Sequence, residues 1–428
     1  MKRRELLAAS GTVLTVSVTG CAAPRSGQDV SSGNSASGTP NRWSMFLHDS
    51  THQRAFTSER AVVAQPSIRW SSETDGAVWS SPVVADGMLY VGCYDGNLYA
   101  MSSETGNLQW RYQTGDRIDG SPAVANGMVY FGSFDRNIYA LDAKTGEERW
   151  IYGTRGIVRS SPTVKNGVVY IGAHCRTEEC NAYYDVQWPE TGYLYAFDAE
   201  TGRLLWQHET NDGVISSPAV LDGTVYVGSS DATLYALDAA TGDILWRFDA
   251  DGPIMSSPVL DDGRVLFGTV SGVLYSVRAK SGDLQWSFDL NRSRGGGVEL
   301  SPVITCSPVV SDETVYVGSM VPGDEIIGKL YAVSSANGTP RWAESRFAQA
   351  IGSSPVVVND VVCFGAHIFG PSANVESGLY AVDSDGSIQW SITYDGTEHN
   401  GFGSSPAVVG TTLYIGSTES HVLAFDLA

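Results

Sequence analysis

The sequence predicts an all-β protein, an eight-bladed β-propeller built of four-stranded antiparallel blades. The main observation is a repeated unit, clearest at 216–246, which reads SSPAVLDGTVYVGSSDATLYALDAATGDILW. Apolar residues alternate there with small or polar ones between Asp-Gly and Thr-Gly turns, a pattern typical of antiparallel strands. This repeat overrides the two or three domains that 428 residues would otherwise suggest.

Three landmarks of the unit give the number of blades. The Ser-Pro pair that opens each unit occurs eight times, with its proline at Pro82, Pro122, Pro162, Pro218, Pro258, Pro308, Pro355 and Pro406. The Leu-Tyr-Ala run or a close variant of it also occurs eight times, at Tyr99, Tyr139, Tyr195, Tyr235, Tyr275, Tyr331 and Tyr380, and last as Val422-Leu423-Ala424. The closing tryptophan recurs seven times, at Trp110, Trp150, Trp206, Trp246, Trp286, Trp342 and Trp390.

The missing eighth tryptophan is found at the other end of the repeat region. Trp70 ends a run at 66–70 and lies 11 residues before Ser81, as Trp110 lies before Ser121. We therefore expect the N-terminal strand to complete the last blade. Such a closure leaves no open edge between the first and last blades.

The closing part of the unit resembles the tryptophan-docking motif of quinoprotein propellers. It reads ALDAKTGEERW at 140–150 and recurs at 196–206 and 236–246. The lead-in WSMFLHD at 43–49, with His52 and Arg54, is similar to the segment before the first blade in such proteins, so that the resemblance covers 43–428. It implies a structural role for the docking tryptophans, namely Trp70, Trp110, Trp150, Trp206, Trp246, Trp286, Trp342 and Trp390.

The family implied by this resemblance has enzymatic and non-enzymatic members. It includes pyrroloquinoline-quinone-dependent alcohol dehydrogenases and a propeller lipoprotein that assists outer-membrane protein assembly. The motif is specific for the fold and says little about activity.

The N-terminal 21 residues resemble an export signal of a lipoprotein. Lys2-Arg3-Arg4 precede an apolar stretch at 6–18, and Cys21 follows small residues as the expected lipid-attachment site. The Arg3-Arg4 pair resembles a twin-arginine signal, and an uncleaved membrane anchor is the alternative. Residues 22–40 are rich in Ser and Gly and predict a disordered tether. We expect a lead-in at 41–65 packed on the propeller at 66–428, held at the outer face of the cytoplasmic membrane.

The charge of the chain restricts its partners. The formal net charge is −20, from 47 acidic and 27 basic residues. This balance argues against nucleic acid, whose phosphates require a basic surface. An acidic, lysine-poor composition is typical of a protein from a salt-loving source, and an ordinary acidic secreted protein is the alternative.

The insertions fall on one face of the predicted ring. With the strands of each blade named A to D from the axis outwards, the A–B interval, from the Ser-Pro proline to the Gly ending strand B, is 10 residues in every blade. The B–C connection is lengthened in blades 3, 6 and 7, and the D–A connection before blades 6 and 8. Long loops grouped on one face favour a binding face there, with blade 3 opposite blade 7 across a cleft. Neutral drift of surface loops is the alternative.

Candidate partner-binding residues lie in these insertions. They are His174, Arg176, Tyr183, Tyr184 and Trp188 in blade 3, Arg292, Arg294 and Glu299 before blade 6, His367 in blade 7, and Glu398, His399 and Asn400 before blade 8. The aromatic side chains suit a partner or a ring-shaped ligand, or else pack the loop onto the propeller. Each histidine is either a ligand or a packing residue of its loop.

Two cysteines of the blade 3 insertion, Cys175 and Cys180, predict a local disulfide because they are close in sequence in an exported protein. A metal site that includes His174 is the alternative, although the Cys-x4-Cys spacing is not a strong zinc signature. We expect no metal site.

The sequence favours a non-enzymatic scaffold that binds a cell-surface or membrane protein, a peptide or a glycan. No Cys-Cys pair, coherent calcium-ligand set or Cys-x-x-Cys-His motif is present, and no catalytic residue is expected. No cofactor is expected either. The alternative is a dehydrogenase of alcohols or sugars that uses pyrroloquinoline quinone and calcium. We expect the propeller to be monomeric.

Overall fold

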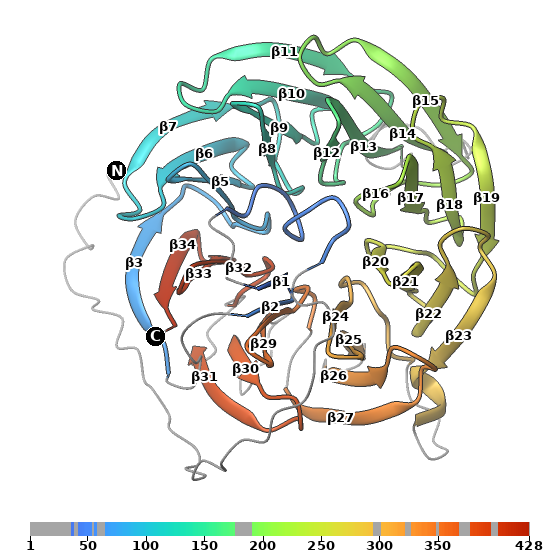
Figure 1. The fold of residues 1–428 in the computed structure, drawn as a ribbon. Coiled ribbons are helices and arrows are strands. Elements are labelled where there is room, and N and C mark those ends of the chain that lie inside the picture. Colours follow the sequence, from blue (N-terminus) through green and yellow to red (C-terminus); the bar gives the residue numbers. More distant parts are fainter. Residues whose placement is uncertain are drawn as a thin grey trace, which may run out of the picture.

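Eight four-stranded sheets form a closed ring in the computed structural model (Figure 1), which confirms the predicted all-β eight-bladed propeller. The structure describes residues 36–37, 42–53, 55–57, 65–175, 191–293, 301–321, 327–347, 351–367, 377–394 and 401–427. Within these residues the helical content is one 3-10 turn, η1 (Leu290–Ser293). No helix in this part of the chain has the length and apolar character needed to traverse a bilayer.

The first four blades follow one another along the chain. Blade 1 consists of β4 (Val83–Ala85), β5 (Met88–Gly92), β6 (Asn97–Ser102) and β7 (Leu108–Gln113). Blade 2 consists of β8 (Ala123–Ala125), β9 (Met128–Gly132), β10 (Asn137–Asp142) and β11 (Glu148–Gly153). Blade 3 consists of β12 (Thr163–Lys165), β13 (Val168–Cys175), β14 (Thr191–Asp198) and β15 (Leu204–Thr210). Blade 4 consists of β16 (Ala219–Leu221), β17 (Thr224–Gly228), β18 (Thr233–Asp238) and β19 (Ile244–Asp249).

The last four blades include both ends of the repeat region. Blade 5 consists of β20 (Val259–Asp261), β21 (Arg264–Gly268), β22 (Val273–Arg278) and β23 (Leu284–Asp289). Blade 6 consists of β24 (Val309–Ser311), β25 (Thr314–Val321), β26 (Ile327–Ser334) and β27 (Pro340–Phe347). Blade 7 consists of β28 (Val356–Val358), β29 (Val361–Ala366), β30 (Ser377–Val382) and β31 (Ile388–Tyr394), extended by β1 (Ala36–Ser37) and β2 (Ala55–Thr57). Blade 8 consists of β32 (Ala407–Val409), β33 (Thr412–Ser417), β34 (His421–Asp426) and β3 (Ser67–Glu73).

Strand β3 closes the ring as the sequence predicts. It pairs antiparallel with β34, with Trp70 opposite Ala424 and Glu73 opposite His421. Strands from opposite ends of the chain therefore share one blade, and β34 has no open edge.

Each docking tryptophan joins its blade to the next one. The indole Nε1–H of Trp246 donates to the carbonyl of Ala279 at 3.0 Å, and Gly282 lies against the ring with a φ of +75°. The same bond, from tryptophan to the following blade, is made by Trp70, Trp110, Trp150, Trp206, Trp286 and Trp342. Trp390 is the exception, because its buried Nε1 has no partner among the described residues. It packs in one core cluster with blade 8, whose C and D strands come from opposite chain ends and share no turn.

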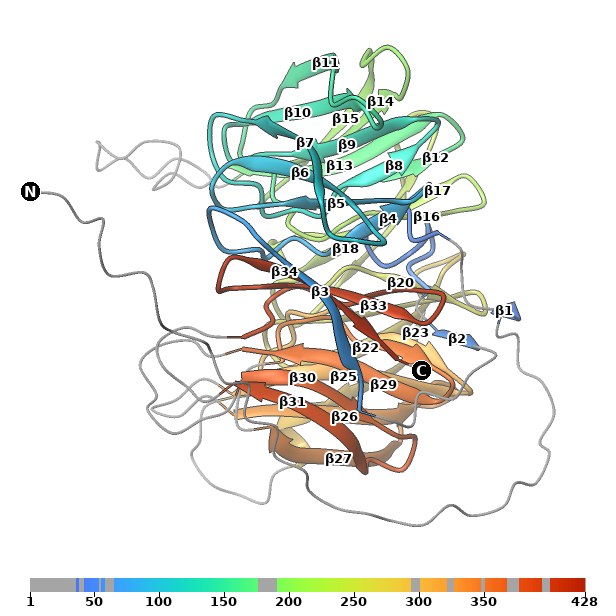
Figure 2. The ribbon, with the colours of Figure 1, turned by 90° about the vertical axis from the view of Figure 1, so that its left-hand side faces the viewer.

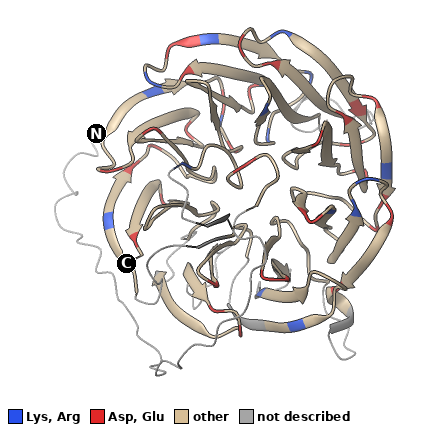
Figure 3. Cartoon of the chain, viewed as in Figure 1, with Lys and Arg blue, Asp and Glu red and all other residues tan. Residues whose placement is uncertain are grey.

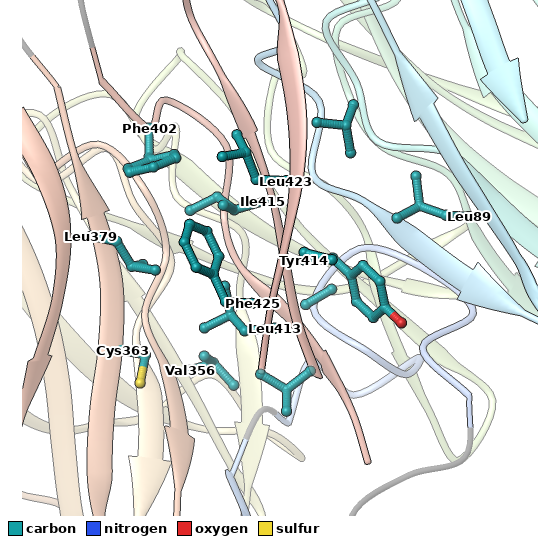
Figure 4. Close-up of a cluster of buried hydrophobic side chains, with 14 of the residues drawn as sticks. Leu89, Val356, Cys363, Leu379, Phe402, Leu413, Tyr414, Ile415, Leu423 and Phe425 are labelled. Atoms are coloured by element: carbon teal, nitrogen blue, oxygen red, sulfur yellow. The ribbon is translucent and has the colours of Figure 1, made fainter. Parts of the chain in front are cut away.

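The core lies between blades rather than at one centre. Figure 4 shows buried side chains of one cluster, with Leu379 of blade 7 and Leu89 of blade 1 on either side of blade 8, which contributes Phe425. Similar clusters fill the other seams. Because such burial supplies most of the favourable free energy of folding, each blade depends on its neighbours.

The connections divide the ring into two faces (Figure 2). The A–B and C–D turns lie on one face, and the B–C turns and D–A segments lie on the other. On the second face, the central strands of blades 3 and 6 are longer than those of blades 1, 2, 4 and 5. In blade 3 the pairing continues to Cys175 opposite Thr191, and in blade 6 to Val321 opposite Ile327. The first residues of these two insertions therefore extend the hairpins.

Charged side chains lie mainly on the outer strands and turns. In Figure 3 the Lys and Arg residues of the described chain are spread around the ring and are interleaved with Asp and Glu. This distribution agrees with the acidic composition and shows no single basic surface of the kind that nucleic acids require.

Candidate functional site

A cavity of about 480 Å³ lies on the axis of the ring. Its wall is made by the residues that lead into strand A in each blade. It opens to the B–C/D–A face, because its rim consists of residues that directly precede the Ser-Ser or Gly-Ser pair, such as Trp79, Arg159 and Met255. We call this cavity the axial pocket.

Eight serines form a continuous hydrogen-bonded ring around the axial pocket. The backbone N–H of Ser217 donates to Oγ of Ser257 at 2.8 Å, and each serine repeats this contact to the next blade. The bond from Ser405 to Ser81, at 2.9 Å, closes the circle between the last blade and the first. The members of this serine ring are Ser81, Ser121, Ser161, Ser217, Ser257, Ser307, Ser354 and Ser405.

In blades 1, 4, 5, 6, 7 and 8 the residue before the ring serine bonds to strand B of its own blade. Blade 2 has Gly120 at this place, and in blade 3 the hydroxyl of Ser160 donates to the carbonyl of Ser216 in the next blade at 3.0 Å. In blade 4, Oγ of Ser216 donates to the carbonyl of Gly228 and accepts from its N–H, at 2.8 and 2.9 Å. Cys306 takes this place in blade 6, where its Sγ–H donates to Gly318. In these six blades the two residues before the proline thus bond once within the blade and once to the next blade.

The lead-in bounds the axial pocket at the opposite face. Trp43 exchanges two backbone bonds of 2.7 Å with Val84 of β4, and the carbonyl of Thr51 accepts from Leu260 of β20. Blades 1 and 5 are on opposite sides of the ring, so this segment crosses the axis (Figure 1). Phe46 lies between these anchors and lines the pocket from below.

A polar pair and an aromatic pair form part of the rim. Nε of Arg159 donates to Oδ2 of Asp119 at 2.6 Å, and the Tyr94 hydroxyl donates to the other carboxylate oxygen at 3.1 Å. Trp79 stacks on Tyr94 with ring centroids 6.1 Å apart. Asp119, with its side chain 9% exposed, is therefore held in one position from both sides.

His367 is the predicted site residue that reaches the axial pocket. It directly follows strand B of blade 7, is 2% exposed, and meets the Trp79 ring edge-on at 4.9 Å between centroids. Burial lowers the pKa of His367 to about 4, because the apolar surroundings disfavour the imidazolium form. The imidazole is therefore uncharged near neutral pH.

His174 lies in strand β13 rather than in a loop. It pairs with Gly192, is 4% exposed and bonds through its backbone N–H to Ile157. Little of its side chain is accessible to a partner in this arrangement, and its binding role stays a prediction. His174 and His367 belong to blades on opposite sides of the ring, as expected.

Most other predicted site residues lie outside the described part of the chain. Arg292 belongs to η1, where only its backbone is described, and Cys175 ends β13. The remaining members are Cys21, Arg176, Cys180, Tyr183, Tyr184, Trp188, Arg294, Glu299, Glu398, His399 and Asn400, which are not described. Their roles, and the disulfide between Cys175 and Cys180, stay predictions.

Sequence reasoning missed the rim residues Trp79, Asp119 and Arg159. A signal was present in the position before the Ser-Ser, Gly-Ser or Cys-Ser pair, which varies from blade to blade while the Ser-Pro that follows is constant. In the eight blades it is Trp79, Asp119, Arg159, Ile215, Met255, Thr305, Gly352 and Gly403. A variable position at the start of the innermost strand points to the axis of a propeller.

The described residues do not fit a quinone bound together with calcium. Calcium takes roughly six to eight oxygen ligands, several of them carboxylates. The described lining of the axial pocket contains one carboxylate, Asp119, which is already paired with Arg159. No group of three or more His, Cys, Asp or Glu side chains suited to a metal is found in the described ranges.

A family model described as outer membrane protein assembly factor BamB matches residues 17–174 and 190–428. The chain belongs to this family. From the sequence we expect a resemblance to quinoprotein propellers, and to the outer-membrane-assembly member more than to the dehydrogenases. The family match confirms this resemblance at the level of the BamB family. A search of curated proteins gave no match.

Solved structures show the same fold at low sequence identity. BamB from Moraxella catarrhalis is 18% identical with a TM-score of 0.64, and the match covers 85% of this chain and 100% of that one. The quinohemoprotein alcohol dehydrogenase ADHIIG from Pseudomonas putida HK5 is 16% identical with a TM-score of 0.70, covering 91% of this chain and 80% of that one. The quinohemoprotein alcohol dehydrogenase from Comamonas testosteroni is 17% identical with a TM-score of 0.70, and the match covers 90% of this chain and 80% of that one. At these identities the likeness concerns the fold alone.

Proposed function

We propose that this BamB-family propeller is a non-enzymatic scaffold that binds a protein, peptide or glycan on its B–C/D–A face. One observation carries the proposal: the axial pocket opens to that face, while the lead-in crosses the opposite end. The insertions of blades 3, 6, 7 and 8 lie on the same face. A rigid ring whose axial pocket opens to the face that carries the variable connections is suited to recognition.

The scaffold acts outside the cytoplasm in this proposal, anchored through a lipid on Cys21 to the outer face of the cytoplasmic membrane. The support is the N-terminal sequence, with its basic start, apolar stretch and cysteine, followed by the Ser- and Gly-rich tether. Mass spectrometry of the full-length protein recovered from membranes tests this part. A peptide that begins at diacylated Cys21 is expected, and an intact residue 1–21 segment would contradict it.

Site-specific photo-crosslinking tests which face binds the partner. A photoreactive residue at exposed Asp116, in a D–A segment, is compared with one at exposed Lys144, in a C–D turn of the same blade. We expect a discrete adduct from position 116 and none from position 144. Adducts from position 144 alone would place the partner on the wrong face for this proposal.

A second variant tests whether the blade 3 insertion takes part in binding. In this variant Asn-Gly replaces residues 176–190. Because Cys175 and Thr191 are paired at the end of their hairpin, a two-residue turn keeps the register of β13 and β14. Loss of the position 116 adduct with an unchanged melting temperature is expected if the blade 3 insertion takes part in binding. An undiminished adduct would exclude this insertion from the binding surface.

A quinone-dependent dehydrogenase of alcohols or sugars is the second candidate, because the fold is similar to that of two quinohemoprotein alcohol dehydrogenases. The absorption spectrum and calcium content of the purified protein distinguish it from the scaffold. Stoichiometric quinone and calcium, together with dye reduction by alcohols or sugars, would overturn the scaffold proposal.

A further inference from the structure

The axial pocket carries no net charge near neutral pH. Its described lining contains three ionisable side chains, those of Asp119, Arg159 and His367. Asp119 and Arg159 neutralise each other at 2.6 Å. His367 is uncharged because burial lowers its pKa. A charged ligand would lose its hydration without gaining a countercharge from these residues, so the lining favours a neutral one.

The serine ring offers hydroxyl groups around most of the circumference of the pocket. The ring oxygens accept backbone N–H groups, and a hydroxyl whose oxygen accepts can still donate its own hydrogen. Within the described residues no acceptor is found for the hydroxyls of Ser81, Ser121, Ser161, Ser217, Ser257, Ser307 and Ser405. Each oxygen also retains acceptor capacity, since a hydroxyl has two lone pairs. The wall can therefore donate to and accept from a ligand that carries hydroxyl groups around its edge.

Most of the remaining lining is apolar. Phe46 rises from the lead-in, and Trp79, Ile215 and Met255 stand at the rim. A ring of hydroxyls between an aromatic base and a rim that is apolar apart from Thr305 and the neutralised Asp119–Arg159 pair suits a molecule with polar edges and apolar faces. The volume of about 480 Å³ lies within the usual range of small-ligand pockets, roughly 300 to 1,000 Å³.

We infer that the axial pocket binds one neutral sugar residue, the end of a glycan that reaches the B–C/D–A face. A pyranose has the required form, with hydroxyls around its edge and C–H groups on its faces. Its hydroxyls would exchange hydrogen bonds with the serine ring, and an apolar face would lie against Trp79 or Phe46. This inference rests on the proposed function and selects the glycan among its possible partners.

Titration calorimetry of the full-length protein in detergent tests the inference. The probes are methyl glycosides of glucose, galactose, mannose and N-acetylglucosamine, with glucuronic acid and glucosamine as charged counterparts. We expect at least one neutral glycoside to bind with one-to-one stoichiometry. The corresponding charged sugars should bind at least tenfold more weakly. Binding of the charged sugars at equal or greater strength would overturn the assignment of a neutral ligand.

Two variants test whether the sugar binds in the axial pocket. Trp79→Ala removes an aromatic wall, and Met255→Trp fills the opening. Each should weaken binding at least tenfold while the melting temperature stays within about 2 °C. Leu245→Ala, a change on the outer strand β19 at a residue 53% exposed, is the control and should bind as the parent does. Unchanged affinity in both pocket variants would overturn the site.

The result also separates this inference from the proposed function. If no glycoside binds but position 116 still gives a protein adduct, the sugar inference fails and the scaffold stands with a protein or peptide partner. If a peptide binds and Met255→Trp abolishes that binding, the pocket is assigned to a peptide and the sugar inference is overturned. If neither a sugar nor an adduct is found, both proposals fail.

Discussion

At the scale of a single residue, His367 makes the unfolding free energy of the protein depend on pH. Burial lowers its pKa to about 4 in the folded chain, against about 6.5 in an unfolded one. Between these two values the unfolded state binds more protons, so stability falls as the pH decreases from 6.5 towards 4. Between pH 7 and pH 4.5 we expect the His367→Gln variant to lose roughly 2 kcal/mol less unfolding free energy than the parent. Denaturant unfolding of variant and parent at pH 7 and 4.5 measures it.

The control for this prediction is Leu245→Ala, which changes an exposed residue of β19 that carries no titratable group. Its pH dependence should match that of the parent. If His367→Gln loses as much stability as the parent between pH 7 and 4.5, the histidine is not buried in its neutral form.

Alanine substitutions at Gly242 and Gly223 distinguish the cost of backbone strain from the cost of disturbing a docked tryptophan. Both have a φ of +78°, which an alanine adopts only at a cost. A Cβ at Gly242 would lie 2.7 Å from the Trp206 ring, whereas one at Gly223 would meet nothing within 4 Å. We expect Gly223→Ala to cost about 1 kcal/mol and Gly242→Ala about 2 kcal/mol more. Equal costs in urea unfolding would mean that the turn does not pack on Trp206.

The pocket residues were harder to predict than the docking residues, for a physical reason. Trp206 and Gly242 recur with their neighbours, so that the repeat itself marks them. The Asp119–Arg159 pair occurs in one seam of eight and joins residues 40 apart in sequence. A single sequence shows that position 119 departs from the repeat, but not which side chain of the next blade it faces.

The lead-in is the element that turns a channel into a pocket, and His52 fixes its far end. His52 is fully buried with a φ of +63°, and its Nδ1 lies 2.8 Å from the carbonyl of Pro258. His52→Ala leaves that buried carbonyl without its side-chain partner, a loss of about 1 to 3 kcal/mol. Because the lead-in can open locally without unfolding the ring, we expect proteolysis of 42–57 to accelerate at least tenfold. The global melting temperature should change by only about 2 °C.

Gln53→Ala is the matched control, since Gln53 is exposed and its side chain also bonds to a strand A carbonyl, that of Leu260. It should leave the proteolysis rate within about twofold of the parent. Equal acceleration in both variants would show that His52 is not the anchor.

The elements themselves were predictable because their signals are local. Asp-Gly and Asn-Gly pairs between short apolar runs mark two-residue hairpins, and the positive φ angles of Asp222 and Gly223 agree with that turn. The lead-in has no such period. Its contacts with strands of blades 1, 2, 4, 5 and 7 span up to 302 residues in sequence, as between Ala55 and Val357, and a local pattern does not specify them.

At the scale of the whole molecule, stability depends on closure. Three sets of interactions hold the first and last blades together. They are the pairing of β3 with β34, the serine bond from Ser405 to Ser81, and the core shared among blades 7, 8 and 1. Without β3, strand β34 would become a free edge, and free edges pair with other chains.

Two truncated chains test this dependence on closure. A chain that starts at residue 65 loses the lead-in and keeps β3, whereas one that starts at residue 75 loses both. Light scattering should show the first as a monomer at all concentrations. The second should form oligomers as its concentration rises, and its unfolding should become less cooperative because blade 8 lacks its outer strand. If the second chain stays monomeric and melts as the first does, closure by β3 contributes little, and the seam is held by the core between blades 7, 8 and 1 together with the serine ring.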